Sequence, residues 1–133
     1  MLTLAVDAAT KGNPGPSGAG IIISGDGYNI QISQALPDLT NHQAEFAAAK
    51  LGFQALLARN LAPNTICLIT DSKLVFQSLE KRYAKHYEKQ VEDILALEQQ
   101  FQLVFHKWRP DHQNKGPHQL AQTALFKQLN TKK

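Results

Sequence analysis

Three acidic residues stand where their carboxylates could meet and hold a cation. Asp7 ends the alternating run 2–7, Asp71 follows the apolar run 65–70, and Glu45 lies one turn into a segment with helical spacing. Ligands of open α/β sheets bind outside the carboxyl ends of the strands, so both aspartates belong at that rim if their strands are parallel neighbours. Clustered carboxylates repel one another unless a cation neutralises them. Oxygen ligands favour Mg²⁺ or Mn²⁺ over zinc, and two such ions about 3.5–4 Å apart can clamp a phosphodiester for hydrolysis.

Each of these acids also has a structural interpretation when it is considered alone. An aspartate at a strand end often forms a turn, and Asp71 suits the N-cap of a following helix. Glu45 would stabilise the start of its helix, although the small residues Ala48, Ala49 and Gly52 leave space around its carboxylate. The residue types alone therefore leave two possibilities open: a metal-dependent phosphoryl-transfer site, or three separate structural acids.

His118 follows Pro117, which we expect to be the first residue of the last helix because proline is well tolerated there. The first turn of a helix carries outward N–H groups and a positive field, which disfavours a cationic imidazole. A neutral ring can bind a metal, whereas the alternative is a solvated first-turn residue. His112, just upstream, is a second candidate, for which a solvated loop residue is the favoured interpretation.

The elements that must position these residues follow from hydrophobic periodicity. Strands are expected over residues 2–7, 21–23, 28–32, 65–70 and 101–105, and helices over 40–59, 71–79, 86–100 and from 117 onward. Residues 11–18 are too rich in glycine and proline for regular structure, while Thr40 to Gln43 fit a capping box. A hairpin followed by strand–helix alternation predicts an α/β protein with a mixed sheet, formed by a single domain over residues 1–133.

The composition is typical of an ordinary globular protein, with 43% hydrophobic and 19% charged residues. Apolar runs fall far short of the roughly 20 residues of a membrane span, and the N-terminus does not resemble a signal peptide. We therefore expect a cytoplasmic protein without membrane attachment, and the single cysteine excludes an internal disulfide. The net charge of +3 is mild, but basic residues and tyrosines gather over residues 81–89. That stretch suits a polyanion or is a solvated helix face.

Several motifs of the chain can be compared with known families. They are Asp7-Ala-Ala-Thr-Lys-Gly-Asn-Pro-Gly-Pro-Ser-Gly, Thr40-Asn-His-Gln-Ala-Glu, Thr70-Asp-Ser-Lys-Leu-Val, Trp108, and Asn114-Lys followed by Leu120-Ala121. Together these motifs resemble those of the type 1 ribonuclease H family. In this order and spacing they cover essentially the whole chain. The resemblance implies a ribonuclease H-like fold, in which a five-stranded mixed sheet of order 3-2-1-4-5 is flanked by about four helices. It also implies an endonuclease that hydrolyses the RNA strand of RNA/DNA hybrids with two divalent metal ions.

The resemblance assigns roles to individual residues of this chain. The metal-binding set it implies is Asp7, Glu45, Asp71 and His118, and the substrate-binding set is Gly12, Asn13, Gly15, Asn41, Ser72 and Lys73. Only glycine permits close approach of the loop backbone to RNA, and the 2′-hydroxyl is what distinguishes RNA from DNA. His118 departs from the family pattern, which usually has a fourth aspartate at this position.

This departure leads to an expectation about the metal and leaves an alternative function open. An imidazole removes one negative charge from the site, so Mn²⁺ is expected to be favoured over Mg²⁺. The alternative is a nucleic-acid-binding module of the same fold whose catalysis is weakened by His118, although a binding module does not need clustered carboxylates. A phosphate-binding P-loop does not fit, because the glycine-rich loop lacks the Gly-Lys-Ser/Thr ending. The expected partner is an RNA/DNA hybrid, bound by a monomer.

Overall fold

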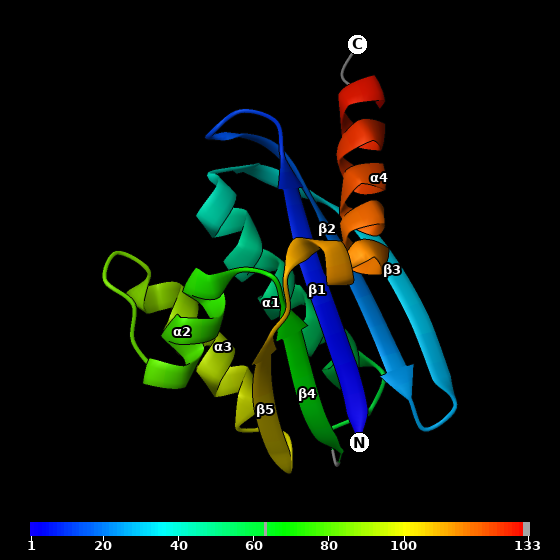
Figure 1. The fold of residues 1–133 in the computed structure, drawn as a ribbon, viewed down its shortest axis with the longest axis vertical. Coiled ribbons are helices and arrows are strands. Elements are labelled where there is room, and N and C mark those ends of the chain that lie inside the picture. The colour runs from blue at the N-terminus through cyan, green and yellow to red at the C-terminus, as the bar shows by residue number, and fades with distance from the viewer. Residues whose placement is uncertain (63, 132–133) are drawn as a thin grey trace.

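The computed structural model describes residues 1–62 and 64–131 of the chain. Within them, a meander of three strands is followed by four helices and two further strands (Figure 1). The strands are β1 (Leu2–Thr10), β2 (Gly15–Gly25), β3 (Tyr28–Leu39), β4 (Thr65–Thr70) and β5 (Leu103–Trp108). The helices are α1 (Asn41–Ala58), α2 (Lys73–Lys81), α3 (Glu88–Glu98) and α4 (Lys115–Thr131), with a 3₁₀ turn, η1, at Asp111–Gln113.

The five strands form one mixed sheet in the order β3-β2-β1-β4-β5, which confirms the predicted order. β1 pairs antiparallel with β2 and parallel with β4, and β4 pairs parallel with β5. In Figure 1, α4 lies on the face of the sheet toward the viewer, whereas α1 lies behind it. β1 and β4 are thus central parallel strands whose carboxyl ends point to the same rim, as the sequence predicted.

The main core lies between the sheet and α1. Alternate residues of β1, namely Leu2, Leu4 and Val6, are buried, and Phe46 and Phe53 of α1 are buried in the same cluster. α1 begins as predicted: Thr40 is its N-cap, and Thr40 and Gln43 form the reciprocal hydrogen bonds of a capping box. The helix that carries Glu45 is therefore anchored at its start by local sequence and along its length by the core.

β2 is much longer than the sequence indicated, because it begins at Gly15 rather than at Ile21. In this stretch, predicted to be irregular, Gly15, Ser17 and Gly18 pair with β3, and Ser17 also pairs with Thr10 of β1. Two strand partners compensate for the low strand propensity of glycine. A Cβ on Gly18 would lie 2.7 Å from the Ala121 carbonyl oxygen, so the small residues of β2 let α4 pack directly on the strand. The small residues that suggested a loop in this stretch instead form the surface of β2 on which α4 packs.

Other boundaries also differ from those predicted. β3 continues from Ile32 to Leu39 beside the lengthened β2. α3 is shorter than predicted because it begins after His86, which has a positive φ of 73°. α4 starts at Lys115, two residues before Pro117. In the described part of the chain, the helices are too short or too polar to cross a membrane.

Candidate active site

Asp7 and Asp71 lie next to each other where β1 and β4 stop pairing. The parallel register ends at Ala5 and Ile69, so each aspartate is two residues beyond the last pair. The prediction that Asp7 ends its strand is wrong, because β1 continues to Thr10 along β2. The two carboxyl groups are close enough for each to shift the pKa of the other. The predicted meeting of these two acids at one rim is therefore present in the structure.

The Asp7 carboxylate is buried and held from two sides. Oδ1 accepts a hydrogen bond of 2.8 Å from the Ala8 amide, and Oδ2 lies 3.0 Å from Nδ1 of His118. Burial raises the pKa of Asp7, and the contacts with Ala8 and His118 oppose this rise. The orientation of the carboxylate is thus set by the backbone of β1 and by a side chain that is more than 100 residues away in the sequence.

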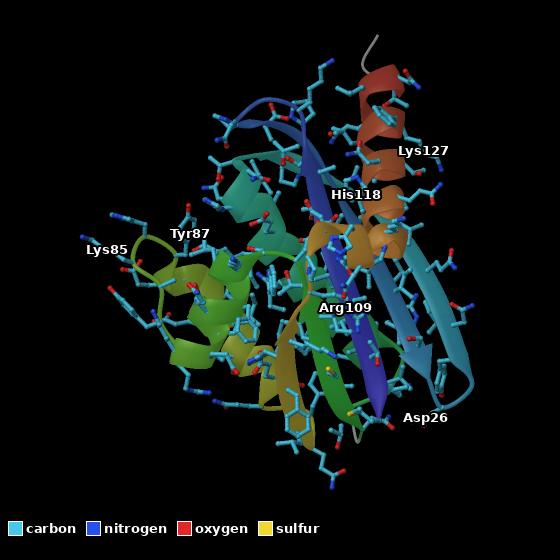
Figure 2. All side chains as sticks on the ribbon, viewed as in Figure 1. Asp26, Lys85, Tyr87, Arg109, His118 and Lys127 are labelled. Atoms are coloured by element: carbon cyan, nitrogen blue, oxygen red, sulfur yellow. The ribbon has the colours of Figure 1, made fainter. Side chains whose placement is uncertain are left out.

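His118 lies near the start of α4 (Figure 2). The anchored start of this helix brings the ring to Asp7. The buried Asn114 donates from Nδ2 to the Val6 carbonyl at 2.9 Å, and the His118 amide donates to the Asn114 carbonyl. Pro117 is accommodated because the first-turn N–H groups of a helix have no partner within the helix. The His118 side chain is 53% exposed and yet contacts an acid that is 6% exposed, so it is more than a solvated first-turn residue.

Asp71 is positioned by the end of β5. The Trp108 Nε1–H donates to the Asp71 carbonyl at 3.0 Å, and the Arg109 amide donates to the Thr70 carbonyl at 2.9 Å. Ser72 is the N-cap of α2, since its side chain accepts from the Val75 amide. Asp71 is therefore not required as a helix cap, which removes the structural interpretation that the sequence left open.

The electrostatics of Asp71 show that negative charge is crowded at this rim. Burial, followed by the neighbouring acids Asp111 and Asp7, raises the pKa of Asp71 to about 9. Because its pKa is raised, the Asp71 carboxyl favours the protonated form at neutral pH. His118 contacts Asp7, and Asp7 and Asp111 are the two acids that raise the pKa of Asp71, so these four residues are neighbours along the rim.

Asp111 is the member of this group that the sequence interpretation missed. It is the first residue of η1, directly after β5. The signal was present in the sequence, because β5 is a parallel strand next to β4 and an aspartate just beyond its end belongs at the same rim. His112, the next residue, is exposed, and its Nε2 lies 3.5 Å from Nε2 of Gln113.

Glu45 lies on the first part of α1, and its side chain is 18% exposed. Its Oε2 lies 3.4 Å from Nδ1 of His42, one turn earlier. Across residues 1–62 and 64–131, no three His, Cys, Asp or Glu side chains are grouped closely enough to hold a metal ion. The four-residue metal-binding set of Asp7, Glu45, Asp71 and His118 therefore stays a prediction.

The donor set at the rim nevertheless fits a hard divalent cation. Adjacent aspartates offer oxygen ligands, and the neighbouring imidazole is a ligand that Mn²⁺ accepts. Burial and the neighbouring acids raise the pKa of Asp71, so its neutral, protonated form is favoured. A divalent ion would take the place of the proton and relieve the same repulsion.

The glycine-rich loop is held against the start of α1. Asn13 Oδ1 accepts from the Asn41 amide at 2.9 Å. Gly12 has a φ of +90°, and a Cβ on Gly15 would lie 1.8 Å from the Lys11 carbonyl oxygen. These glycines are therefore required by the turn itself, before any approach of RNA is considered.

Ser72 and Lys73 lie beside Asp71 at the start of α2. The Ser72 oxygen accepts the Val75 amide, which leaves its hydroxyl hydrogen able to donate elsewhere. The Lys73 ammonium lies 5.0 Å from the centroid of the Trp108 ring, a cation–π distance. The predicted substrate-binding residues thus lie in two groups, the loop with Asn41 and the start of α2, and their contacts with substrate stay predictions.

The strand order and the acids at one rim of the sheet define an α/β protein with an acidic edge. The family model described as RNase H matches residues 1–124, and the chain belongs to the RNase H family. It is 40% identical over 135 residues to a protein of Enterococcus faecalis named "Putative hydrolase EbsB", and the alignment covers all of both chains.

Two further similarities connect the chain to proteins named for ribonuclease H. It is 33% identical over 86 residues to the Ribonuclease H of Desulforamulus reducens, covering 65% of this chain and 52% of that protein. The crystal structure of RNase H1 from Halobacterium salinarum superposes with a TM-score of 0.85 and 26% identity, covering 95% of this chain and 98% of that one.

Proposed function

We propose that this chain is an endonuclease that hydrolyses the RNA strand of RNA/DNA hybrids with two divalent metal ions. One observation carries the proposal: Asp7 contacts both Asp71 and His118 at the ends of two parallel strands. In a member of the RNase H family, this position is where a metal-dependent phosphodiester hydrolysis would be placed.

Asp7, Glu45, Asp71 and His118 would hold the ions. Bound divalent metal supplies Lewis acidity, a more acidic water nucleophile and charge stabilisation for the leaving oxygen. The chain prepares for this by fixing its ligands: the Ala8 amide orients Asp7, Trp108 holds the backbone of Asp71, and Asn114 anchors the turn that carries His118. Ligands that are held in place before binding lose little freedom when the metal arrives.

The hybrid would lie across the glycine-rich loop and the start of α2. Gly12 and Asn13 are exposed next to Asn41, where a sugar-phosphate chain can approach closely, and the buried Gly15 would support the tight turn behind them. Ser72 and Lys73 lie beside Asp71 and can donate to phosphate oxygens. Contacts with 2′-hydroxyls at the loop would select RNA over DNA in the strand to be cut.

The metal preference follows from the imidazole at position 118. With a neutral ligand in place of a carboxylate, the site has less negative charge for Mg²⁺, while Mn²⁺ accepts nitrogen more readily. We therefore propose faster cleavage with Mn²⁺ than with Mg²⁺. A cytoplasmic location, a monomeric state and a single domain over residues 1–133 are retained as predictions from the sequence.

A weakened nucleic-acid-binding module is the second candidate function. The observation in its favour is that Glu45 contacts His42, while His118 takes the place of an acid. In that case the fold would bind hybrid without cutting it. The rim acids argue for catalysis, since a binding surface for phosphates gains nothing from carboxylates that repel them.

The deciding experiment compares cleavage of an end-labelled RNA/DNA hybrid with a DNA/DNA duplex of the same sequence. Each is incubated with Mg²⁺, Mn²⁺ or EDTA, and binding is measured in parallel at several salt concentrations. Internal cuts in the RNA strand, with the DNA duplex intact, support the proposed nuclease. Hybrid binding without any cut in either metal supports the binding module, and equal cutting of both duplexes contradicts hybrid specificity.

A further inference from the structure

His106 joins three elements at the outer edge of the sheet. It lies on β5, the outer strand, beside which α2 and α3 are placed (Figure 1). Its Nδ1 is 2.9 Å from Oε2 of Glu80 on α2, and its Nε2 is 2.7 Å from Oε2 of Glu98 on α3. The His106 side chain is only 7% exposed, so each ring nitrogen depends on its glutamate for a hydrogen bond.

The two contacts together need two protons. A carboxylate only accepts hydrogen bonds, and a neutral imidazole carries one N–H, whereas the imidazolium cation carries two. With a neutral ring, one of the two contacts would bring a nitrogen lone pair against a carboxylate oxygen, which is repulsive. The arrangement of α2, β5 and α3 around His106 is therefore that of the cationic ring.

The charged groups that face this ring come from the two helices. Within residues 1–62 and 64–131, the ion pairs of His106 are those with the two glutamates. β4 places the uncharged Leu68 opposite His106, and the neighbours on the same face of β5 are Val104 and Trp108. Lys73, at the other end of α2, lies 5.0 Å from the centroid of the Trp108 ring. The acids therefore dominate the surroundings of the ring.

These surroundings decide when the second proton is bound. Burial lowers the pKa of His106, but the hydrogen bonds to Glu98 and Glu80 outweigh burial and raise it above its ordinary value. The cationic ring is therefore complete below about pH 6.5, and one proton is lost as the pH rises through the raised pKa.

Loss of one proton would affect the two glutamates unequally. The Glu98 side chain is 10% exposed, and leaving it buried without a donor would be costly. The Glu80 side chain is 53% exposed and can exchange its contact with the ring for water. The remaining N–H is therefore expected on Nε2, toward Glu98, and the contact between β5 and α2 is the one that opens.

Glu80 stands at the end of α2, just before the basic stretch of residues 81–89. The helix ends one residue after Glu80, and its C-cap Arg82 has a positive φ of 61°. We propose that His106 is a proton-dependent fastener, which holds the end of α2 to β5 when it carries two N–H groups and releases Glu80 when it carries one. Release would let residues 80–85 move, and with them part of a stretch whose charge suits a polyanion. The fastener requires neither metal nor cleavage.

The test follows the ring and the end of α2 in the full chain, from about pH 6 to about pH 10. Nitrogen-15 shifts of the His106 ring report which nitrogens are protonated, and carbon-13 relaxation gives the order parameters of residues 80–85. Glu80→Gln is the main variant, because an amide can accept from a ring N–H or donate to a bare ring nitrogen. Its contact with the ring no longer depends on the second proton.

Two further variants complete the set. His106→Gln removes the titrating ring. His112→Gln is the matched control, because His112 is an exposed histidine outside the cluster. If His106→Gln does not fold, Glu80→Gln decides alone, since the Glu80 side chain is half exposed and its position tolerates an amide.

In the wild type, both ring nitrogens of His106 should carry a proton near the acid end of the range, and one should lose it as the pH rises. The order parameters of residues 80–85 should fall over the same pH range, from about 0.85 to below about 0.6. In Glu80→Gln the ring should titrate at a lower pH, because one carboxylate is gone, and the order of residues 80–85 should not follow the titration. The order parameters of His106→Gln should not depend on pH, and His112→Gln should behave as the wild type does.

Three results would overturn the fastener. The first is a ring that carries a single N–H throughout the pH range. The second is a ring that titrates while residues 80–85 stay equally ordered, and the third is a loss of order that persists unchanged in Glu80→Gln. Cleavage of hybrid enters none of these measurements, so the fastener and the proposed nuclease can fail separately.

Discussion

The contact between α4 and β2 can be tested by adding a single methyl group. Gly20 lies in β2 opposite the first turns of α4, and a Cβ there would lie 1.9 Å from the Pro117 carbonyl oxygen and 2.6 Å from the Ala121 amide nitrogen. Both neighbours are backbone atoms, so neither can rotate away as a side chain would. Gly20→Ala therefore requires the helix and the strand to separate.

The size of the separation follows from the contact distances. To reach an ordinary van der Waals distance of 3.4 Å from 1.9 Å, the helix must move by about 1.5 Å. Overpacking of this kind destabilises proteins by about 1–3 kcal/mol, and rigid backbone on both sides places this case near 3 kcal/mol. A movement of that size would also carry His118 out of hydrogen-bonding range of Asp7, which is 3.0 Å away.

Urea unfolding measures the loss in the free energy of unfolding, and cleavage of hybrid reports on the displaced His118. Ser24→Ala is the matched control, because Ser24 is a half-buried residue further along the same face of β2 and should change stability by less than about 0.5 kcal/mol. If Gly20→Ala unfolds at the same urea concentration as the wild type, the tight packing of α4 on β2 is refuted.

Three other variants test the site and the core around it. Asp71→Asn should abolish hybrid cleavage while the melting temperature does not fall, because Ser72 is the helix cap; wild-type turnover would remove Asp71 from the mechanism. His118→Asp should raise the rate of cleavage with Mg²⁺ relative to the rate with Mn²⁺. If this ratio of rates is unchanged in both His118→Asp and His118→Ala, the ring of His118 does not act on the metal. Burial alone would lower the pKa of His106, but its hydrogen bonds to Glu98 and Glu80 outweigh this and raise it. The stability that this pairing contributes is complete below about pH 6.5 and is lost as pH rises through the raised pKa of His106. The urea midpoint of His106→Gln should therefore depend less on pH than that of the wild type, and an equal dependence would contradict the role of His106.

Much of the fold could be predicted because local patterns decide it. The alternation in β1, the capping box at Thr40 and the apolar run before Asp71 depend on near neighbours in the chain, and each appears in the structure. The element boundaries around residues 11–18 could not be predicted in the same way. Glycine and proline there have the composition of a loop, but pairing with two strands and packing against α4 make residues 15–18 part of a strand.

The sequence by itself determined which residues could do chemistry and at which edge of the sheet they would lie. Asp7 and Asp71 follow runs that had to become parallel strands, and that topology brings strand ends together whatever the details of packing. The tertiary structure decided which side chains are in contact. Asp111 reaches Asp71 through the register between β4 and β5, and His118 reaches Asp7 because Asn114 fixes α4 on β1. These contacts join residues about 40 and 111 positions apart, and their distances depend on cumulative backbone geometry that no local pattern in the sequence encodes.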